Sequence, residues 1–224
     1  MRLIDHKTGI DCNLKSDELN AIIVENARAY EGVVSRLFGR INGTDEELLL
    51  YDEKNELLKN AKSCDIIFSP FDLNLQNSKF QKKLISYLSA VIESDEIGQK
   101  IVDNYTERNY IAEKIQELSE YPISFDCEYS LANILKEMNV KLAELTGSFA
   151  EKMLDYMSAC RDLLDIKTFF MIGCKAYISL DEYCHLRKWI EYQNLELIFV
   201  ENTDNHLPEY INKYILDEDM CFIH

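Results

Sequence analysis

Three lysines near the middle of the chain have the spacing of a binding face for an anionic partner. Lys79, Lys82 and Lys83 stand at positions i, i+3 and i+4, so on a helix their ammonium groups share one side. Like charges at this spacing repel by roughly 0.2–0.5 kcal/mol per pair unless a partner compensates them. A row of nucleic-acid phosphates would be such a partner. The alternative is an ordinary solvated helix surface.

Three arginines form a second set with helical spacing. Arg36 and Arg40 are one turn apart, and Arg28 lies two turns before Arg36. A guanidinium group binds phosphate through two parallel hydrogen bonds, so this set is a second candidate phosphate-binding face. The alternative is pairing within the chain, with Glu31 or with the acids at 45–47.

Two groups of acids are candidate cation sites. Calcium takes six to eight oxygen ligands, which carboxylates, main-chain carbonyls and water can supply together. The spacing of a calcium-binding EF-hand loop is absent from the sequence, and solvated carboxylates are the alternative. The second of the two groups, the acids at 217–219, is more simply explained as polar residues between two pieces of edge strand, or as groups that bond across a subunit boundary. The first group comprises Glu117, Glu120, Asp126 and Glu128.

No enzymatic constellation is evident from the spacing of the residues. The phosphate-binding pattern Gly-x-x-x-x-Gly-Lys-Ser/Thr and the nucleophile pattern Gly-x-Ser-x-Gly are both missing from the sequence. The apolar run that ends in Glu201 looks like the strand that nucleotide hydrolases use to hold magnesium, but many buried strands end in a glutamate. The four histidines show no metal-binding spacing. No catalytic residue is predicted.

Composition narrows the class of protein. The formal net charge of −16 argues against nucleic acid at face value, but binding of phosphate depends on local potential rather than on whole-chain charge. The seven cysteines form no Cys-x-x-Cys pair, which indicates free thiols and a reducing compartment. No apolar run approaches the roughly 18 residues of a membrane span, and the amino terminus lacks the apolar core of a signal peptide. We expect a soluble, cytoplasmic protein.

The order of predicted elements indicates an α/β fold. Short apolar runs at 21–24, 48–51, 66–68, 140–142, 169–172 and 195–201 predict strands, and helical patterns separate most of them. Ser179 and Glu182 have the spacing of a capping box at the start of a helix. This alternation predicts a head domain over 1–75 and 122–224, with a mixed sheet and helices on its faces.

Residues 76–121 break this alternation. Apolar residues recur there at helical spacing, which predicts two long helices that meet near 93–95, with Ser94 as the N-cap of the second. We expect these helices to form an extended α-helical leg inserted into the head.

The carboxyl-terminal part of the chain carries a family resemblance. Residues 214–219 (Tyr-Ile-Leu-Asp-Glu-Asp) and 194–201 (Asn-Leu-Glu-Leu-Ile-Phe-Val-Glu) resemble the last strands of the CRISPR-associated Csn-two family. Weaker similarities lie at 71–74, 83–85, 140–142 and 180–182, in the family's order. The first fifty residues match only in the pattern of elements.

The resemblance implies a function that spacing alone does not give. It implies an α/β head related to a degenerate nucleotide-hydrolase-like fold, a helical leg, and assembly into a homotetrameric ring. Members of the family bind double-stranded DNA, chiefly at linear ends, with other CRISPR adaptation proteins during spacer acquisition in antiviral defence. They also bind calcium, which favours the ring and which the resemblance places near Glu117 and Glu128. No catalysis is implied.

Two other hypotheses remain open from the sequence. A degenerate hydrolase that still binds nucleotide would show affinity for ATP. An acidic scaffold that contacts only proteins would not shift DNA at any salt concentration. The sequence also leaves open which basic face would line the hole of a ring.

Overall fold

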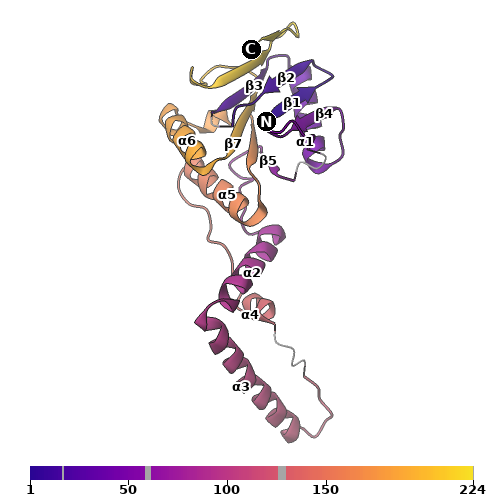
Figure 1. Ribbon diagram of the computed structural model, residues 1–224, viewed down its shortest axis with the longest axis vertical. Helices are drawn as coiled ribbons and strands as arrows, with labels where there is room; N and C mark the ends of the chain where they lie inside the picture. The colour runs from indigo at the N-terminus through magenta and orange to yellow at the C-terminus, as the bar shows by residue number, and fades with distance from the viewer. Residues whose placement is uncertain (17, 59–61, 126–129, 224) are drawn as a thin grey trace. The chain divides into compact units, whose positions relative to one another are not determined.

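The structure is a computed structural model that describes residues 1–16, 18–58, 62–125 and 130–223 (Figure 1). The chain divides into two compact units. The head unit comprises Met1–Asn74 and Leu145–His224, and the helical unit comprises Leu75–Glu144. Among the described residues, no helix combines the length and the apolar character that a bilayer crossing requires.

The main sheet of the head unit has six strands in the order β5-β6-β7-β3-β8-β9. Five neighbouring strands run parallel, and the edge strand β9 is antiparallel to β8. All five residues of β3 and all five of β6 are buried, as expected for a parallel sheet covered on both faces. The predicted mixed α/β architecture is therefore confirmed. The strands are β3 (Asn20–Val24), β5 (Cys64–Ile67), β6 (Thr168–Ile172), β7 (Glu196–Glu201), β8 (Asn212–Leu216) and β9 (Phe222–Ile223).

Helices cover both faces of this sheet. One set of alternating strand residues, which includes Ile22 and Ile198, packs in a core with Val33 and Leu37 of α1 (Ala27–Asn42). Residues of the opposite parity face α6 (Leu180–Gln193), where the ring of Tyr183 lies 5.3 Å from that of Phe199. Figure 1 shows α1 on one side of the sheet and α6 with α5 (Phe149–Leu164) on the other.

The caps of these helices follow the sequence. The predicted capping box of Ser179 and Glu182 is present at the start of α6, and Ser148 with Glu151 forms another at the start of α5. A short 3₁₀ helix, η1 (Lys175–Tyr177), joins β6 to α6. Each capping box satisfies two backbone groups at a helix start that would otherwise lack partners.

A second, antiparallel sheet of three strands lies on the other side of α1. Its order is β2 (Ile10–Asn13), β1 (Arg2–Asp5) and β4 (Leu48–Tyr51), and its inward residues join the same apolar core as Val33 and Leu37. The sequence predicted β4 but not β1 or β2. These two strands have only four residues each. In β2 the alternate residues Asp11 and Asn13 are exposed, and in β1 the charged Asp5 takes an inward position, so neither strand has an apolar run in the sequence.

The helical unit contains α2 (Ser78–Glu93), α3 (Glu96–Leu118) and α4 (Leu131–Glu137). Its buried cluster joins Ile85 of α2 to Leu131 and Leu135 of α4. The break between α2 and α3 falls where it was predicted, but its capping differs. Asp95 is the N-cap of α3 and accepts a hydrogen bond from the Ile97 amide, whereas Ser94 ends α2.

The helical unit extends beyond the predicted boundary at residue 121. Because the apolar residues of α4 pack on α2, the segment up to Glu144 belongs to this unit. The predicted strand at 140–142 does not form. Its carbonyls accept side-chain hydrogen bonds instead, Val140 from Gln81 and Leu142 from Gln76 at 2.8 Å.

Candidate nucleic-acid interface

The three lysines of α2 lie together on its solvent face. Lys79, Lys82 and Lys83 are exposed, and the buried residues of the helix, which include Leu84, are on the opposite side. In the described part of the chain, no ion pair or hydrogen bond engages their ammonium groups. We call Lys79, Lys82 and Lys83 the lysine face. It is the group that the sequence predicted, and its cations are available to a partner.

The surroundings of the lysine face contain few carboxylates in sequence. Residues 73–92 contain no Asp or Glu, although the chain has 40 acids in all. Ser86 is exposed one turn beyond Lys82 and Lys83, so it continues the lysine face along the helix. Its hydroxyl donates to the Lys82 carbonyl at 3.0 Å and can rotate toward a phosphate oxygen, a common acceptor from hydroxyl groups in nucleic-acid complexes. The spacing of this serine was visible in the sequence, but its place on the same face was not recognised.

The position of the lysines within α2 adds to the local potential. Lys79 lies in the first turn, where the positive end of the helix macrodipole acts, Lys82 and Lys83 follow in the second turn, and the first turn contains no acid. A cation at this end is unfavourable by roughly 0.3–1 kcal/mol at low ionic strength. The N-cap Asn77 accepts hydrogen bonds from the amides of Lys79 and Phe80. The helix start is thus internally satisfied but strongly electropositive, which suits an anionic partner.

The arginines of α1 have a different environment. Arg36 makes two hydrogen bonds to Asp5, Nε to Oδ1 at 2.9 Å and Nη2 to Oδ2 at 2.6 Å. The side chain of Asp5 is 0% exposed and that of Arg36 is 16% exposed. Arg40 is 6% exposed, and its Nη2 donates to the Leu58 carbonyl. Both guanidinium groups serve the interior of the head unit. The expectation that they bind DNA phosphates is therefore corrected, and the partner is Asp5 rather than Glu31 or the acids at 45–47.

Arg28 differs from the other two arginines because it is exposed in the first turn of α1. The N-cap of this helix is Asn26, whose side chain accepts from the amides of Arg28 and Ala29. Arg28 remains a candidate for phosphate binding on the head unit.

The predicted cation site is only partly described. Glu117 makes an ion pair of 2.6 Å with Lys114, and Glu120 is exposed. Asp126 and Glu128 lie outside the described residues. Within the described ranges, no group of three or more His, Cys, Asp or Glu side chains is placed to hold a metal ion.

The second acidic group forms the turn between β8 and β9. The amide of Cys221 donates to Oδ1 of Asp217 at 2.7 Å, and the amide of Asp217 donates to the Cys221 carbonyl. The acids at 217–219 therefore connect two pieces of edge strand, as the first of the two sequence interpretations expects.

The carboxyl edge of the parallel sheet is the usual ligand site of an open α/β fold. Here β3 and α1 are joined by Glu25 and Asn26 alone, and Asn26 caps the helix itself. Glu201 at the end of β7 is 2% exposed, and its Oε1 accepts a hydrogen bond from the Lys175 amide at 2.9 Å. Burial raises the pKa of the Glu201 carboxyl. Glu201 thus binds the backbone at the start of η1, and Asn26 caps α1. Because both groups are already engaged in the fold, the structure disfavours the interpretation of the chain as a nucleotide hydrolase.

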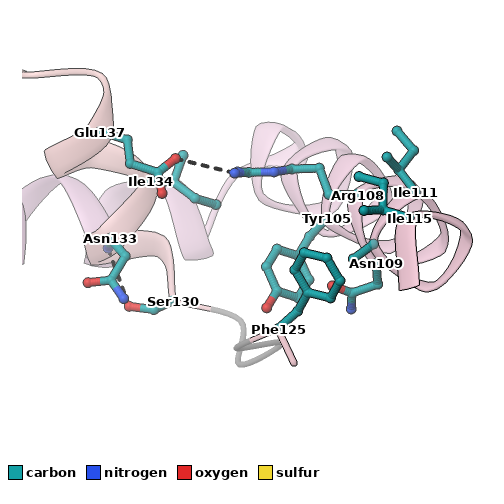
Figure 2. A pocket seen from close by; sticks show the side chains of 11 residues that line it. Tyr105, Arg108, Asn109, Ile111, Ile115, Phe125, Ser130, Asn133, Ile134 and Glu137 are labelled. Carbon is teal, nitrogen blue, oxygen red and sulfur yellow. Dashed lines mark hydrogen bonds and ion pairs between the residues drawn. The ribbon is translucent and has the colours of Figure 1, made fainter. Parts of the chain in front are cut away.

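A shallow pocket of about 400 Å³ lies within the helical unit (Figure 2). Apolar side chains of α3 and α4, among them Ile115 and Ile134, line it together with Phe125. Arg108 and Glu137 form an ion pair of 3.4 Å at its edge. Ser130 in the lining caps α4 by accepting a hydrogen bond from the Asn133 amide, and Glu137 is paired with Arg108, so we assign the pocket no chemistry.

Comparison with known proteins places this geometry in a family. A family described as CRISPR-associated protein (Cas_Csn2) matches residues 42–220, which is most of the chain. The chain belongs to this family. The match includes the lysine face and the strands at 194–201 and 214–219 that carried the resemblance, and it supports a CRISPR-associated role. It begins at residue 42, so it does not include α1 up to Ile41 or the first three strands.

The other comparisons add little. No curated protein matches the chain. Among solved structures, cbiO1 from Clostridium perfringens, part of the ABC transporter complex cbiONQ, is 18% identical. That alignment covers 92% of this chain and 76% of the other, with a TM-score of 0.45. A likeness this low carries no argument about activity, and the relation to nucleotide hydrolases remains a prediction.

Proposed function

We propose that this Cas_Csn2 protein binds double-stranded DNA, preferably at linear ends, as a non-enzymatic component of CRISPR spacer acquisition. The observation that carries the proposal is the lysine face, a set of three exposed cations that have no partner among the described residues, within a stretch of chain free of acids. Family membership supports the setting in CRISPR adaptation.

The chemistry of the face favours contact with the DNA backbone. Lysine binds phosphate as a mobile point charge, and the Ser86 hydroxyl can add a hydrogen bond. The side chains that most often distinguish bases are Arg, Asn and Gln. The lysine face is bordered by the exposed Ser86 and Tyr87, and Gln81 is engaged with the Val140 carbonyl. Binding should therefore depend little on DNA sequence and strongly on salt.

Assembly would solve the problem of the negative charge. A single copy with a net charge of −16 repels DNA at long range, whereas a closed homotetramer with its lysine faces turned inward would present cations to a duplex from several sides. If about 6–8 phosphates are neutralised in the ring, the logarithm of the binding constant should fall with the logarithm of salt concentration with a slope of about −6. A slope near zero would contradict this mode of binding.

Calcium is the divalent ion that the family implies for assembly. Glu117 and Glu120 provide hard oxygen donors of the type that calcium prefers, but two carboxylates fall short of the six to eight oxygens it takes. Within the described residues the fit is thus incomplete, and further ligands would have to come from elsewhere. Calcium therefore enters the proposal only as an ion that promotes contact between anionic copies.

A gel shift with linear and covalently closed circular duplexes of the same sequence tests the proposal. The variant Lys79→Glu, Lys82→Glu, Lys83→Glu should lose at least tenfold in affinity for linear DNA, because reversing three charges removes several phosphate contacts. The matched control Lys100→Glu, Lys136→Glu, Lys141→Glu makes the same charge change at exposed positions of the same unit. Equal losses in both variants would refute a specific role of the lysine face.

The same experiment addresses the other hypotheses. If wild-type protein shifts no DNA at any salt or calcium concentration, a scaffold that contacts only proteins explains the chain better. If the protein binds ATP with measurable affinity, the degenerate hydrolase that still binds nucleotide explains the chain better, despite the short connection between β3 and α1.

A further inference from the structure

We propose that the lysine face of one copy also binds three consecutive acids of a second copy, Asp217–Asp219, which we call the acidic turn. The contact would occupy the same ammonium groups that DNA would need. The contact between copies follows from the charges and exposure of the two surfaces alone, whereas its competition with DNA rests on the proposed function.

The acidic turn is held in a defined position by its hairpin. Asp217 exchanges backbone and side-chain hydrogen bonds with Cys221, and the Met220 amide donates to the Asp217 carbonyl. The Glu218 carbonyl accepts from the Asn26 side chain. Glu218 and Asp219 are exposed, and no cation of the described residues pairs with either carboxylate. The turn therefore presents two free negative charges and a third half-exposed one.

The chain contains a second run of three acids at 45–47, and two of its three carboxylates are already engaged within the chain. Asp45 accepts hydrogen bonds from the amides of Glu47 and Leu48 through Oδ1. Glu47 makes an ion pair of 3.0 Å with Lys7. Of the two runs, the acidic turn has two adjacent exposed carboxylates without a cation among the described residues, whereas in the run at 45–47 only Glu46 is exposed without one. This difference is why we select the acidic turn as the occupant of the lysine face.

The two surfaces match in size. Residues three and four apart on a helix have Cβ atoms about 5–6 Å apart. Three consecutive residues of a turn extend over a similar length, since extended chain advances by about 3.3 Å per residue. Lysine and glutamate side chains are long and flexible, so several pairs can form at once without movement of the backbone.

The way in which association changes with salt concentration distinguishes this contact from overall repulsion and from apolar contacts. Two copies with a net charge of −16 repel each other overall, and lowering the salt concentration lengthens the range of that repulsion. General electrostatics therefore predicts that the copies separate at low salt. A local contact between lysines and acids predicts that the copies associate at low salt, because weaker screening strengthens the attraction between their opposite charges. Apolar contacts would change little.

Sedimentation analysis without DNA or divalent ions tests the contact. Wild-type protein should show a higher average mass at 30 mM than at 500 mM NaCl, with an apparent dissociation constant roughly tenfold lower, since each exposed pair contributes little and several act together. Two double variants should each abolish this dependence on salt: Glu218→Lys with Asp219→Lys, and Lys79→Glu with Lys83→Glu. Combining all four changes in one chain should restore it. The matched control Glu46→Lys, Glu53→Lys changes two exposed acids by the same amount and should not abolish it.

The outcomes separate the two proposals. A wild-type mass that stays constant or falls at low salt, or loss of the dependence in the Glu46/Glu53 control, overturns the contact between copies. If the mass rises at low salt but the lysine-face variant binds DNA normally, the contact stands and the proposed function fails. If both hold, Glu218→Gln, Asp219→Asn should raise affinity for linear duplex at low salt several-fold more than Glu46→Gln, Glu53→Gln.

Discussion

The buried ion pair of the head unit gives the sharpest prediction about the arginines. Asp5 accepts both guanidinium hydrogen bonds of Arg36, and Oδ2 also accepts from the Thr8 hydroxyl at 2.6 Å. Changing Arg36→Met removes the cation and leaves a fully buried carboxylate without a counter-charge, held only by the hydrogen bonds from Thr8 and Lys7. Loss of one partner of such a pair costs about 3–5 kcal/mol. For a unit of this size, 1 kcal/mol corresponds to roughly 2–4 °C in Tm, so we expect Tm to fall by about 10 °C.

Replacing both partners should be far less harmful. In Asp5→Leu, Arg36→Met the buried charge is gone, and an apolar pair of similar volume is often neutral relative to a buried ion pair. We expect the double variant to recover most of the lost Tm, with a residual cost because the Thr8 hydroxyl and the Lys7 amide lose their acceptor. Thermal unfolding followed by circular dichroism measures both variants.

The same double variant tests the exclusion of Arg36 from the DNA interface. At a temperature well below its Tm, its affinity for linear duplex should lie within about twofold of wild type, because the Arg36 side chain faces Asp5 and not solvent. A folded double variant that lost tenfold or more in affinity would show that Arg36 contacts phosphate, and the structural assignment of this arginine would then be refuted.

Three further predictions concern the stability and reactivity of the head unit. Burial raises the pKa of the Glu201 carboxyl, so its ionisation is disfavoured in the folded state and the stability of the wild type falls as pH rises through the folded pKa. Glu201→Gln lacks this ionisation. Its unfolding free energy relative to wild type, measured with urea, should therefore increase from pH 5 to pH 8. Gly147 has φ +96°, and an added Cβ would lie 2.2 Å from Oε2 of Glu151, so Gly147→Ala should disrupt the capping box of α5 and cost about 1–2 kcal/mol in the same assay. Burial raises the pKa of the Cys64 thiol to about 12, so in a Cys127→Ser background a thiol reagent at pH 8 should label the exposed Cys184 and Cys221 quickly and Cys64 only after unfolding, as mass spectrometry would show.

The sequence was most informative where a local pattern has one physical outcome. The buried strands β3, β6 and β7 read as continuous apolar runs because both of their faces are covered, and each formed within a residue or two of its predicted position. Capping boxes are equally local. Elements that depend on distant partners were missed or misplaced. The strands β1 and β2 exist because they close over α1, and the residues at 140–142 bond to α2 rather than pair with a strand.

The two basic sets show where spacing alone stops being informative. Arg36 and Arg40 have the same separation as Lys79 and Lys83, so the sequence treated both as surface faces. The difference lies in what surrounds each helix. Because α1 lies between two sheets, its polar side meets the carboxylate of Asp5, whereas the buried residues of α2 occupy one side only. The strand that carries Asp5 was not predicted, so its pairing with Arg36 could not be anticipated.

The net charge of the chain and its proposed affinity for DNA are compatible because electrostatic interactions are local in salt. At physiological ionic strength, charges more than about 8 Å apart are largely screened from each other. A phosphate held by the ammonium group of Lys79 or Lys83 therefore responds mainly to side chains within the next turn or two, and residues 73–92 supply no carboxylate there. Most of the 40 acids act at a distance, where they lower the rate of encounter and oppose contact between copies. The excess of acids then favours partners that engage the lysine face directly, and a DNA phosphate or the acidic turn of another copy meets that requirement.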